Sequence, residues 1–133
     1  MTTKVPKTRC SGTMTESAFY SFIRSGLRQK SQRWRPIFDC KKLAQVPYSG
    51  TDKRTKYLYT CAICNGDFKG TETMVDHIVP CGSLKSFDDL PAFVERLFCE
   101  VGGLRVLCKT CHQEVTNAER LAKKTVDKHN QTI

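Results

Sequence analysis

The sequence predicts a small α+β domain that is held together by a four-cysteine zinc site and preceded by a basic helical extension. Three observations predict this class: two Cys-x-x-Cys pairs, apolar residues at helical spacing before the first pair and after the second, and short β-branched or aromatic runs beside both pairs. The 133 residues leave room for only one modest core. A bound metal ion would therefore be an economical staple.

Positive charge is concentrated in the first half of the chain. Residues 1–60 hold 13 Lys or Arg against 3 Asp or Glu, whereas residues 61–133 hold 9 against 10, which together give the net charge of +9. A basic surface gains affinity for a polyanion by releasing the counterions of phosphate groups. We expect DNA as the partner, with a merely solubilising basic surface as the alternative.

The hydropathy of the chain and its first residues indicate where in the cell the protein is expected. We find no run near the roughly 18 apolar residues of a membrane span. Residues 1–11 are polar and basic, without the apolar stretch of a secretory signal. The sequence therefore predicts a cytoplasmic protein with no membrane partner, in which paired cysteines bind metal rather than form disulfides.

The first 56 residues are expected to form an arm and a helical extension. Residues 1–14 have little to bury and are predicted to be a flexible arm, and residues 15–56 form the basic extension. A helix is predicted over residues 16–31 after an N-cap at Thr15. The apolar residues at helical spacing, which we expect to face inward, are Phe19, Phe22, Ile23 and Leu27.

Cations on and after this helix are the predicted DNA-binding residues. They are Arg24, Arg28, Lys30, Arg33 and Arg35. Trp34, in the middle of the last group, either packs in the core or stacks on a base. Pro36 is expected to stop the helix, and residues 39–45 to form a short second one.

Residues 57–125 are predicted to be the main domain. Strands are expected at residues 57–59, 72–79 and 104–107, with Gly66 adopting a positive φ in the turn after the first Cys pair. Ser86 begins an inserted helix. The last helix should open around residues 108–112 and run to about Lys124, with Val115 and Leu121 packing inward, and residues 126–133 should fray.

The strongest single signal is the set of four thiolates. Cys61 and Cys64, with Cys108 and Cys111, have the two-residue gaps that let both sulfurs of a pair reach one tetrahedral zinc ion. Four protein thiolates leave no open position, so this zinc would be structural. The remaining cysteines, Cys10, Cys40, Cys81 and Cys99, lack such spacing and are predicted to be ordinary free thiols.

Three polar residues stand beside the Cys pairs. Asp76 and His77 are neighbours in a predicted strand, and His112 directly follows the last thiolate. Adjacent strand residues point to opposite faces, so one of Asp76 and His77 would bind metal while the other activates water. A carboxylate, an imidazole and phosphate oxygens suit Mg²⁺ or another hard divalent ion.

These motifs together resemble the HNH (ββα-metal, or His-Me finger) endonuclease superfamily, in the four-cysteine subgroup common in bacteriophages. The resemblance covers about residues 57–120. It is carried by Cys61-x-x-Cys64, Asp76-His77-Ile-Val-Pro80, the run from Leu104 to His112, and Thr116, with Gly82-Ser-Leu and Asp88 to Phe98 as further agreement.

The resemblance implies a function and roles. It implies a metal-dependent DNA endonuclease, phage-encoded and acting in the host cytoplasm, that leaves 5′-phosphate and 3′-hydroxyl ends. In that family Asp76 would be the first ligand of the catalytic metal, His77 the general base and His112 the second ligand. Thr116 would either contact the metal through water or simply cap and pack.

One departure from the family pattern leaves a second function open. The middle Asn of the motif, which braces the loop behind the catalytic His, falls on Gly103 here. This change predicts either a substitute brace or a slower enzyme. The alternative function is a non-catalytic zinc-knuckle DNA-binding or regulatory protein with a degenerate site. The basic charge and the four thiolates fit both, and only Asp76, His77 and His112 separate them.

Overall fold

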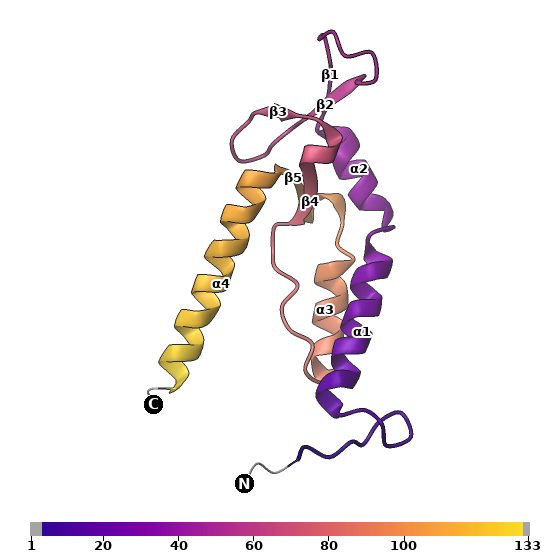
Figure 1. Ribbon diagram of the computed structural model, residues 1–133, viewed down its shortest axis with the longest axis vertical. Helices are drawn as coiled ribbons and strands as arrows, with labels where there is room; N and C mark the ends of the chain where they lie inside the picture. The colour runs from indigo at the N-terminus through magenta and orange to yellow at the C-terminus, as the bar shows by residue number, and fades with distance from the viewer. Residues whose placement is uncertain (1–3, 132–133) are drawn as a thin grey trace.

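The protein is a mixed helix and sheet structure, as the sequence predicted. The computed structural model describes the backbone of residues 4–131 and the side chains of residues 4–123. Within that range it has four α-helices and two small antiparallel sheets (Figure 1). The elements are α1 (Glu16–Ser31), α2 (Arg35–Leu43), β1 (Gln45–Pro47), β2 (Tyr57–Thr60), β3 (Asp67–Phe68), β4 (Thr73–His77), α3 (Leu90–Leu97), β5 (Leu104–Cys108) and α4 (Lys109–Gln131).

The two sheets divide the strands between them. Strands β1, β2 and β3 form one antiparallel sheet in that order, and β4 pairs with β5 in the other. In the second sheet Asp76 is opposite Arg105 and His77 is opposite Leu104. Strands β1 and β3 were not predicted, because two or three residues are too short for an alternating pattern to be visible.

Helix α1 matches its predicted bounds, and its buried face partly differs from the prediction. The Thr15 side chain accepts a hydrogen bond from the Ala18 N–H and caps the helix. Tyr20 is buried against Phe93 and Leu97 of α3, with Phe19, Ile23 and Leu27 beside it. The prediction for Phe22 was wrong: it is 70% exposed, because it lies off the stripe that the 3.6-residue period directs toward α3.

Helix α2 begins four residues earlier than predicted, at Arg35 rather than residue 39. Helix α1 has already ended at Ser31, so Pro36 does not stop it. Proline instead occupies the first turn of α2, where its missing N–H needs no partner and its fixed φ suits the helix.

Part of the arm predicted to be flexible has a defined fold. Arg9 and Met14 form an isolated β-bridge around a turn. The Arg9 guanidinium lies 4.4 Å from the ring centre of Phe19, and its Nε is 2.8 Å from the Glu16 carboxylate. A cation held by an aromatic face and a carboxylate fixes this turn against α1. Residues 1–3 of the predicted arm lie outside the described residues.

Helix α4 starts against β5 and β4 and then diverges from the other helices (Figure 1). Its first turns are packed, since Val115 contacts the cluster of buried cysteines. Leu121, which we expected to face inward, is 67% exposed. The helix continues to Gln131, beyond the end predicted near Lys124 and through most of the segment expected to fray; residues 132–133 lie outside the described residues.

None of the helices in the described range has the length and apolar character needed to cross a membrane.

Candidate active site and metal centre

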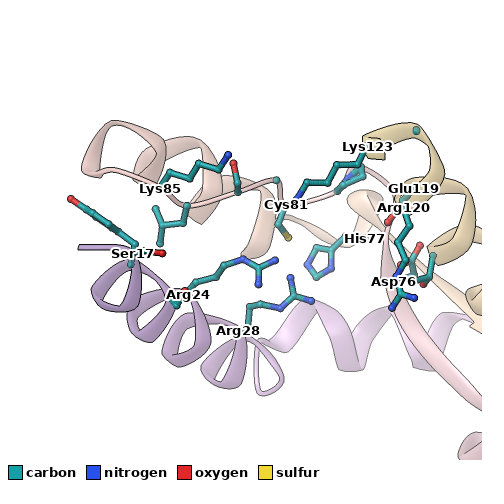
Figure 2. Close-up of a pocket in the computed structure, with 18 residues that line it drawn as sticks. Ser17, Arg24, Arg28, Asp76, His77, Cys81, Lys85, Glu119, Arg120 and Lys123 are labelled. Atoms are coloured by element: carbon teal, nitrogen blue, oxygen red, sulfur yellow. The ribbon is translucent and has the colours of Figure 1, made fainter. Parts of the chain in front are cut away.

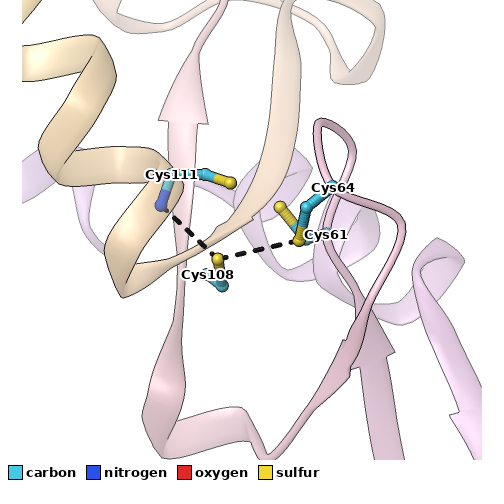
Figure 3. Close-up of side chains that lie close together, drawn as sticks. All are labelled: Cys61, Cys64, Cys108 and Cys111. Carbon is cyan, nitrogen blue, oxygen red and sulfur yellow. Dashed lines mark hydrogen bonds between the residues drawn. The ribbon is translucent and has the colours of Figure 1, made fainter.

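Four cysteines from two distant parts of the chain meet at one point (Figure 3). Cys61 and Cys64 come from the turn between β2 and β3, and Cys108 and Cys111 from the junction of β5 and α4. Their sulfur atoms all lie within 4.8 Å of one another, and the Cys64 and Cys108 sulfurs are 3.9 Å apart. Two sulfurs of a tetrahedral zinc site with bonds of about 2.3 Å are about 3.8 Å apart. The predicted cluster is therefore present, with a geometry that could hold zinc.

The electrostatics of the cluster also favour a cation. Burial by itself raises the pKa of Cys61, but backbone N–H groups, including those of Cys64 and Cys108, donate to its sulfur and lower that pKa to about 6. A side-chain hydrogen bond with Cys108 raises the pKa of Cys111 to about 12, because it favours the protonated thiol, and burial raises that pKa further. A divalent metal ion would displace these protons and hold all four sulfurs as thiolates.

The turn between Cys61 and Cys64 depends on the two residues that follow it. Asn65, not Gly66 as predicted, has the positive φ of 61°, and its N–H bonds to the Cys61 carbonyl. Asn tolerates this left-handed conformation better than most residues. Gly66 is needed for space instead, because a Cβ there would lie 2.9 Å from the Phe68 ring.

The second candidate site lies at the end of the β4–β5 pair. The Asp76 carboxylate is 15% exposed and has a nitrogen-bearing side chain on each side: Oδ2 accepts from Arg105 Nε at 3.2 Å, and Oδ1 is 3.8 Å from His112 Nε2. Arg105 is the cross-strand neighbour of Asp76, and His112 lies on the first turn of α4. With metal–ligand bonds of about 2.1 Å, two ligands of one ion are at most about 4.2 Å apart, so Asp76 and His112 fit a shared divalent ion.

His77 points in another direction from Asp76, as adjacent residues of a strand must. Its Nε2 lies 2.9 Å from the backbone oxygen of Leu97, at the end of α3. The ring is half-buried and also lines a cleft that Asp76 shares. The three predicted site residues are thus brought to one end of the small sheet.

That cleft has a volume of about 1100 Å³ and lies between α1 and α4 (Figure 2). Arg24 and Arg28 of α1 extend from one side toward the His77 ring. The lining residues of α4 are Thr116, Glu119, Arg120, Ala122 and Lys123. The loop that follows β4 adds Cys81 and Lys85. The arrangement is a hollow with basic groups on both helices, and Asp76 and His77 also line it.

The structure divides the predicted DNA-binding residues. Arg24 and Arg28 line the cleft, whereas Lys30, Arg33 and Arg35 are exposed elsewhere. Arg35 makes an exposed ion pair with Asp39 at 3.8 Å. Among the cations of the cleft, Lys85, Arg120 and Lys123 were missed by the sequence reasoning. A signal existed for two of them, since Thr116, Arg120 and Lys123 follow His112 at spacings of three and four, on one helix face.

Thr116 lines the cleft one turn after His112, which leaves both of its predicted roles open. Trp34, for which core packing and base stacking were both considered, is half-buried and packs against the end of α3. Its ring meets Phe98 edge-on at 5.5 Å between centroids, and its Nε1 donates to the Cys99 carbonyl at 2.7 Å.

Comparisons with models of protein families, with curated proteins and with solved structures find no match for this chain. The fold and the two candidate sites therefore define it only as a mixed α+β protein with a four-cysteine cluster that could bind a metal ion and with a basic cleft.

Proposed function

We propose that the protein is a metal-dependent DNA endonuclease of the HNH type, in which β4, β5 and α4 form the ββα-metal core and Cys61, Cys64, Cys108 and Cys111 hold a structural zinc. The observation that carries the proposal is that Asp76 and His77 line a basic cleft while His112 Nε2 lies 3.8 Å from the Asp76 carboxylate. The resemblance of the motifs to that family supports the same reading.

Each residue has a role that its position supports. Asp76 Oδ1 and His112 Nε2 would hold the catalytic divalent ion, for which Mg²⁺ is the natural candidate. When bound, the ion supplies charge that polarises the scissile phosphate and stabilises the leaving oxygen. Arg105 donates a hydrogen bond to Oδ2 of Asp76, which keeps Oδ1 oriented toward His112. Thr116 lines the same cleft as Asp76, one turn after His112 on α4.

His77 would activate the attacking water. It takes a proton from water, the water oxygen bonds to phosphorus, and the bond from phosphorus to the 3′-oxygen breaks. The 3′-oxygen then gains a proton from solvent, which leaves 5′-phosphate and 3′-hydroxyl ends. Because the His77 and Asp76 side chains point in different directions, His77 would serve as the base while Asp76 binds the metal ion.

The cleft would hold the DNA backbone. Arg24 and Arg28 from α1, with Arg120 and Lys123 from α4, place positive charge on both helices beside the site. Phosphate contacts of this kind supply affinity and register without reading sequence. DNA is thus the substrate that the charge and the site support together.

The test is plasmid cleavage by zinc-loaded wild type and His77→Ala, with Mg²⁺, with Mn²⁺ and with EDTA. We expect cleavage that needs added metal and falls by about 10² to 10⁴ in His77→Ala, with DNA affinity nearly unchanged. Lys42→Ala, an exposed cation of α2, is the matched control and should cleave normally. Unchanged cleavage by His77→Ala would contradict the assignment of His77 as the general base of a nuclease.

The second candidate is a non-catalytic zinc-knuckle DNA-binding or regulatory protein. The observation that favours it is the Arg105–Asp76 ion pair, because a carboxylate already neutralised by arginine has less need of a metal ion. A zinc-loaded wild type that binds DNA and cleaves none with any metal would establish this alternative.

A further inference from the structure

The last turn of α3 lies directly behind His77. His77 Nε2 is 2.9 Å from the Leu97 carbonyl oxygen. A carbonyl carries no hydrogen, so this contact requires Nε2 to be the donor. A neutral ring that donates through Nε2 has its lone pair on Nδ1, and the contact therefore selects one tautomer.

The end of α3 is itself held by a residue far away in sequence. Trp34, between α1 and α2, donates from Nε1 to the Cys99 carbonyl at 2.7 Å and packs its ring against Phe98. Leu97 is 1% exposed, and the Phe98 N–H closes the helix on Val94. Contacts on both sides of the turn thus fix the position of the Leu97 carbonyl.

Gly103 provides the space for this turn. Its carbonyl accepts from the Ile78 N–H at 2.9 Å, which extends the β4–β5 pairing past His77. A Cβ at Gly103 would stand 3.0 Å from the sulfur and 3.2 Å from the Cβ of Cys99. Both contacts are tighter than ordinary van der Waals contact, so a side chain here would press on the turn that carries Cys99.

We propose that Trp34 is a positioning residue: through the last turn of α3 it holds the Leu97 carbonyl on Nε2 of His77 and leaves Nδ1 as the atom that accepts a proton. The lack of a side chain at Gly103 leaves the space that this arrangement requires. The proposal rests on the proposed function, in which His77 is the base. The brace that the family motif assigns to an Asn side chain is supplied here by the α3 backbone and an indole N–H.

The test uses Trp34→Phe, which keeps an aromatic ring to pack against Phe98 but removes the N–H donor together with the five-membered ring of the indole. Long-range ¹H–¹⁵N spectra of the zinc-loaded full chain report the His77 tautomer, with its signals assigned by their loss in His77→Gln. Wild type should show the tautomer protonated on Nε2, and Trp34→Phe a mixture of both. We expect kcat to fall by roughly 10- to 100-fold with KM nearly unchanged.

A second pair of variants guards against a simple folding defect. Gly103→Ala should disturb the tautomer in the same way, and adding Cys99→Ala should restore it in part because the sulfur at 3.0 Å is gone. Tyr59→Phe, another half-buried aromatic that loses one polar group, is the control and should alter neither readout.

The outcomes separate the two proposals. If Trp34→Phe and Gly103→Ala both keep the His77 tautomer of the wild type and their kcat is unchanged, the positioning role is overturned. A wild type with no cleavage under any metal overturns the proposed nuclease, while the spectra still decide whether Trp34 orients His77.

Discussion

At the scale of single residues, the eight cysteines show how the environment of a thiol changes its properties. Four have their sulfurs gathered in one cluster that could hold a metal ion. Of the others, Cys40 and Cys81 are buried, Cys99 is half-buried and Cys10 is exposed. Burial raises the pKa of the three that are covered, because a thiolate loses hydration in the interior.

This contrast predicts the pattern of alkylation in zinc-loaded protein. At pH 8, iodoacetamide should modify Cys10 rapidly, and Cys40, Cys81 and Cys99 slowly, because a raised pKa leaves little thiolate at that pH. Peptide mapping by mass spectrometry measures each rate. The alkylation rates of Cys40, Cys81 and Cys99 should rise when the pH is raised toward the pKa values of these thiols. Modification of Cys81 as fast as Cys10 would contradict the burial on which this prediction depends.

At the scale of elements, the relation between α1 and α4 creates the cleft. Helix α1 is fixed by its apolar face against α3, and α4 by its first turns against β5. Beyond those turns α4 diverges, and the cleft lies between the two helices (Figures 1 and 2). Neither helix by itself forms a basic groove.

The two helices should contribute similarly to DNA binding. Arg24→Gln with Arg28→Gln, and separately Arg120→Gln with Lys123→Gln, should each weaken binding and reduce the slope of log Kd against log salt by about 2, one for each phosphate contact. Fluorescence anisotropy over a salt series measures both quantities.

The control for these variants removes the same charge outside the cleft. Lys30→Gln with Arg33→Gln changes one exposed cation in the last turn of α1 and one exposed cation just after that helix. We expect a smaller change of slope. An equal loss in all three variants would mean that net charge, rather than the cleft, determines binding.

At the scale of the whole molecule, the cysteine cluster joins the two sheets. One Cys pair follows β2 of the three-stranded sheet, and the other ends β5 of the two-stranded sheet. A backbone hydrogen bond of 2.8 Å from Ala62 to Val106 is a further link beside the cluster. The cluster is also part of the core, since Leu107 and Cys61 are fully buried within it. In a chain of this size, few other contacts can substitute for such a junction.

Zinc removal should therefore unfold more than the cluster. Chelation, or Cys108→Ser, should lower the melting temperature by more than about 10 °C, because the binding free energy of a structural zinc is also folding free energy. Circular dichroism melts with a zinc assay measure this. Cys10→Ser, which changes an exposed thiol outside the cluster, should melt as wild type does. Equal melting of chelated and zinc-loaded protein would contradict a structural role for the site.

The sequence by itself determined the fold class, the helix of residues 16–31, the strands that hold Asp76 and Arg105, and the four cysteines that meet. Each of these follows from short-range spacing: a 3.6-residue period, alternation in a strand, or two-residue gaps between ligands.

Only the tertiary structure decided which faces are covered and what lies behind the site. Phe22 and Leu121 satisfy a helical pattern and yet are exposed, because burial depends on whether another element lies opposite. The Leu97 carbonyl behind His77 and the Trp34 donor on Cys99 involve backbone groups, which every residue carries and no side-chain pattern reveals. Such contacts arise when distant segments pack together, and their partners are set by the position of the chain in space rather than by local sequence.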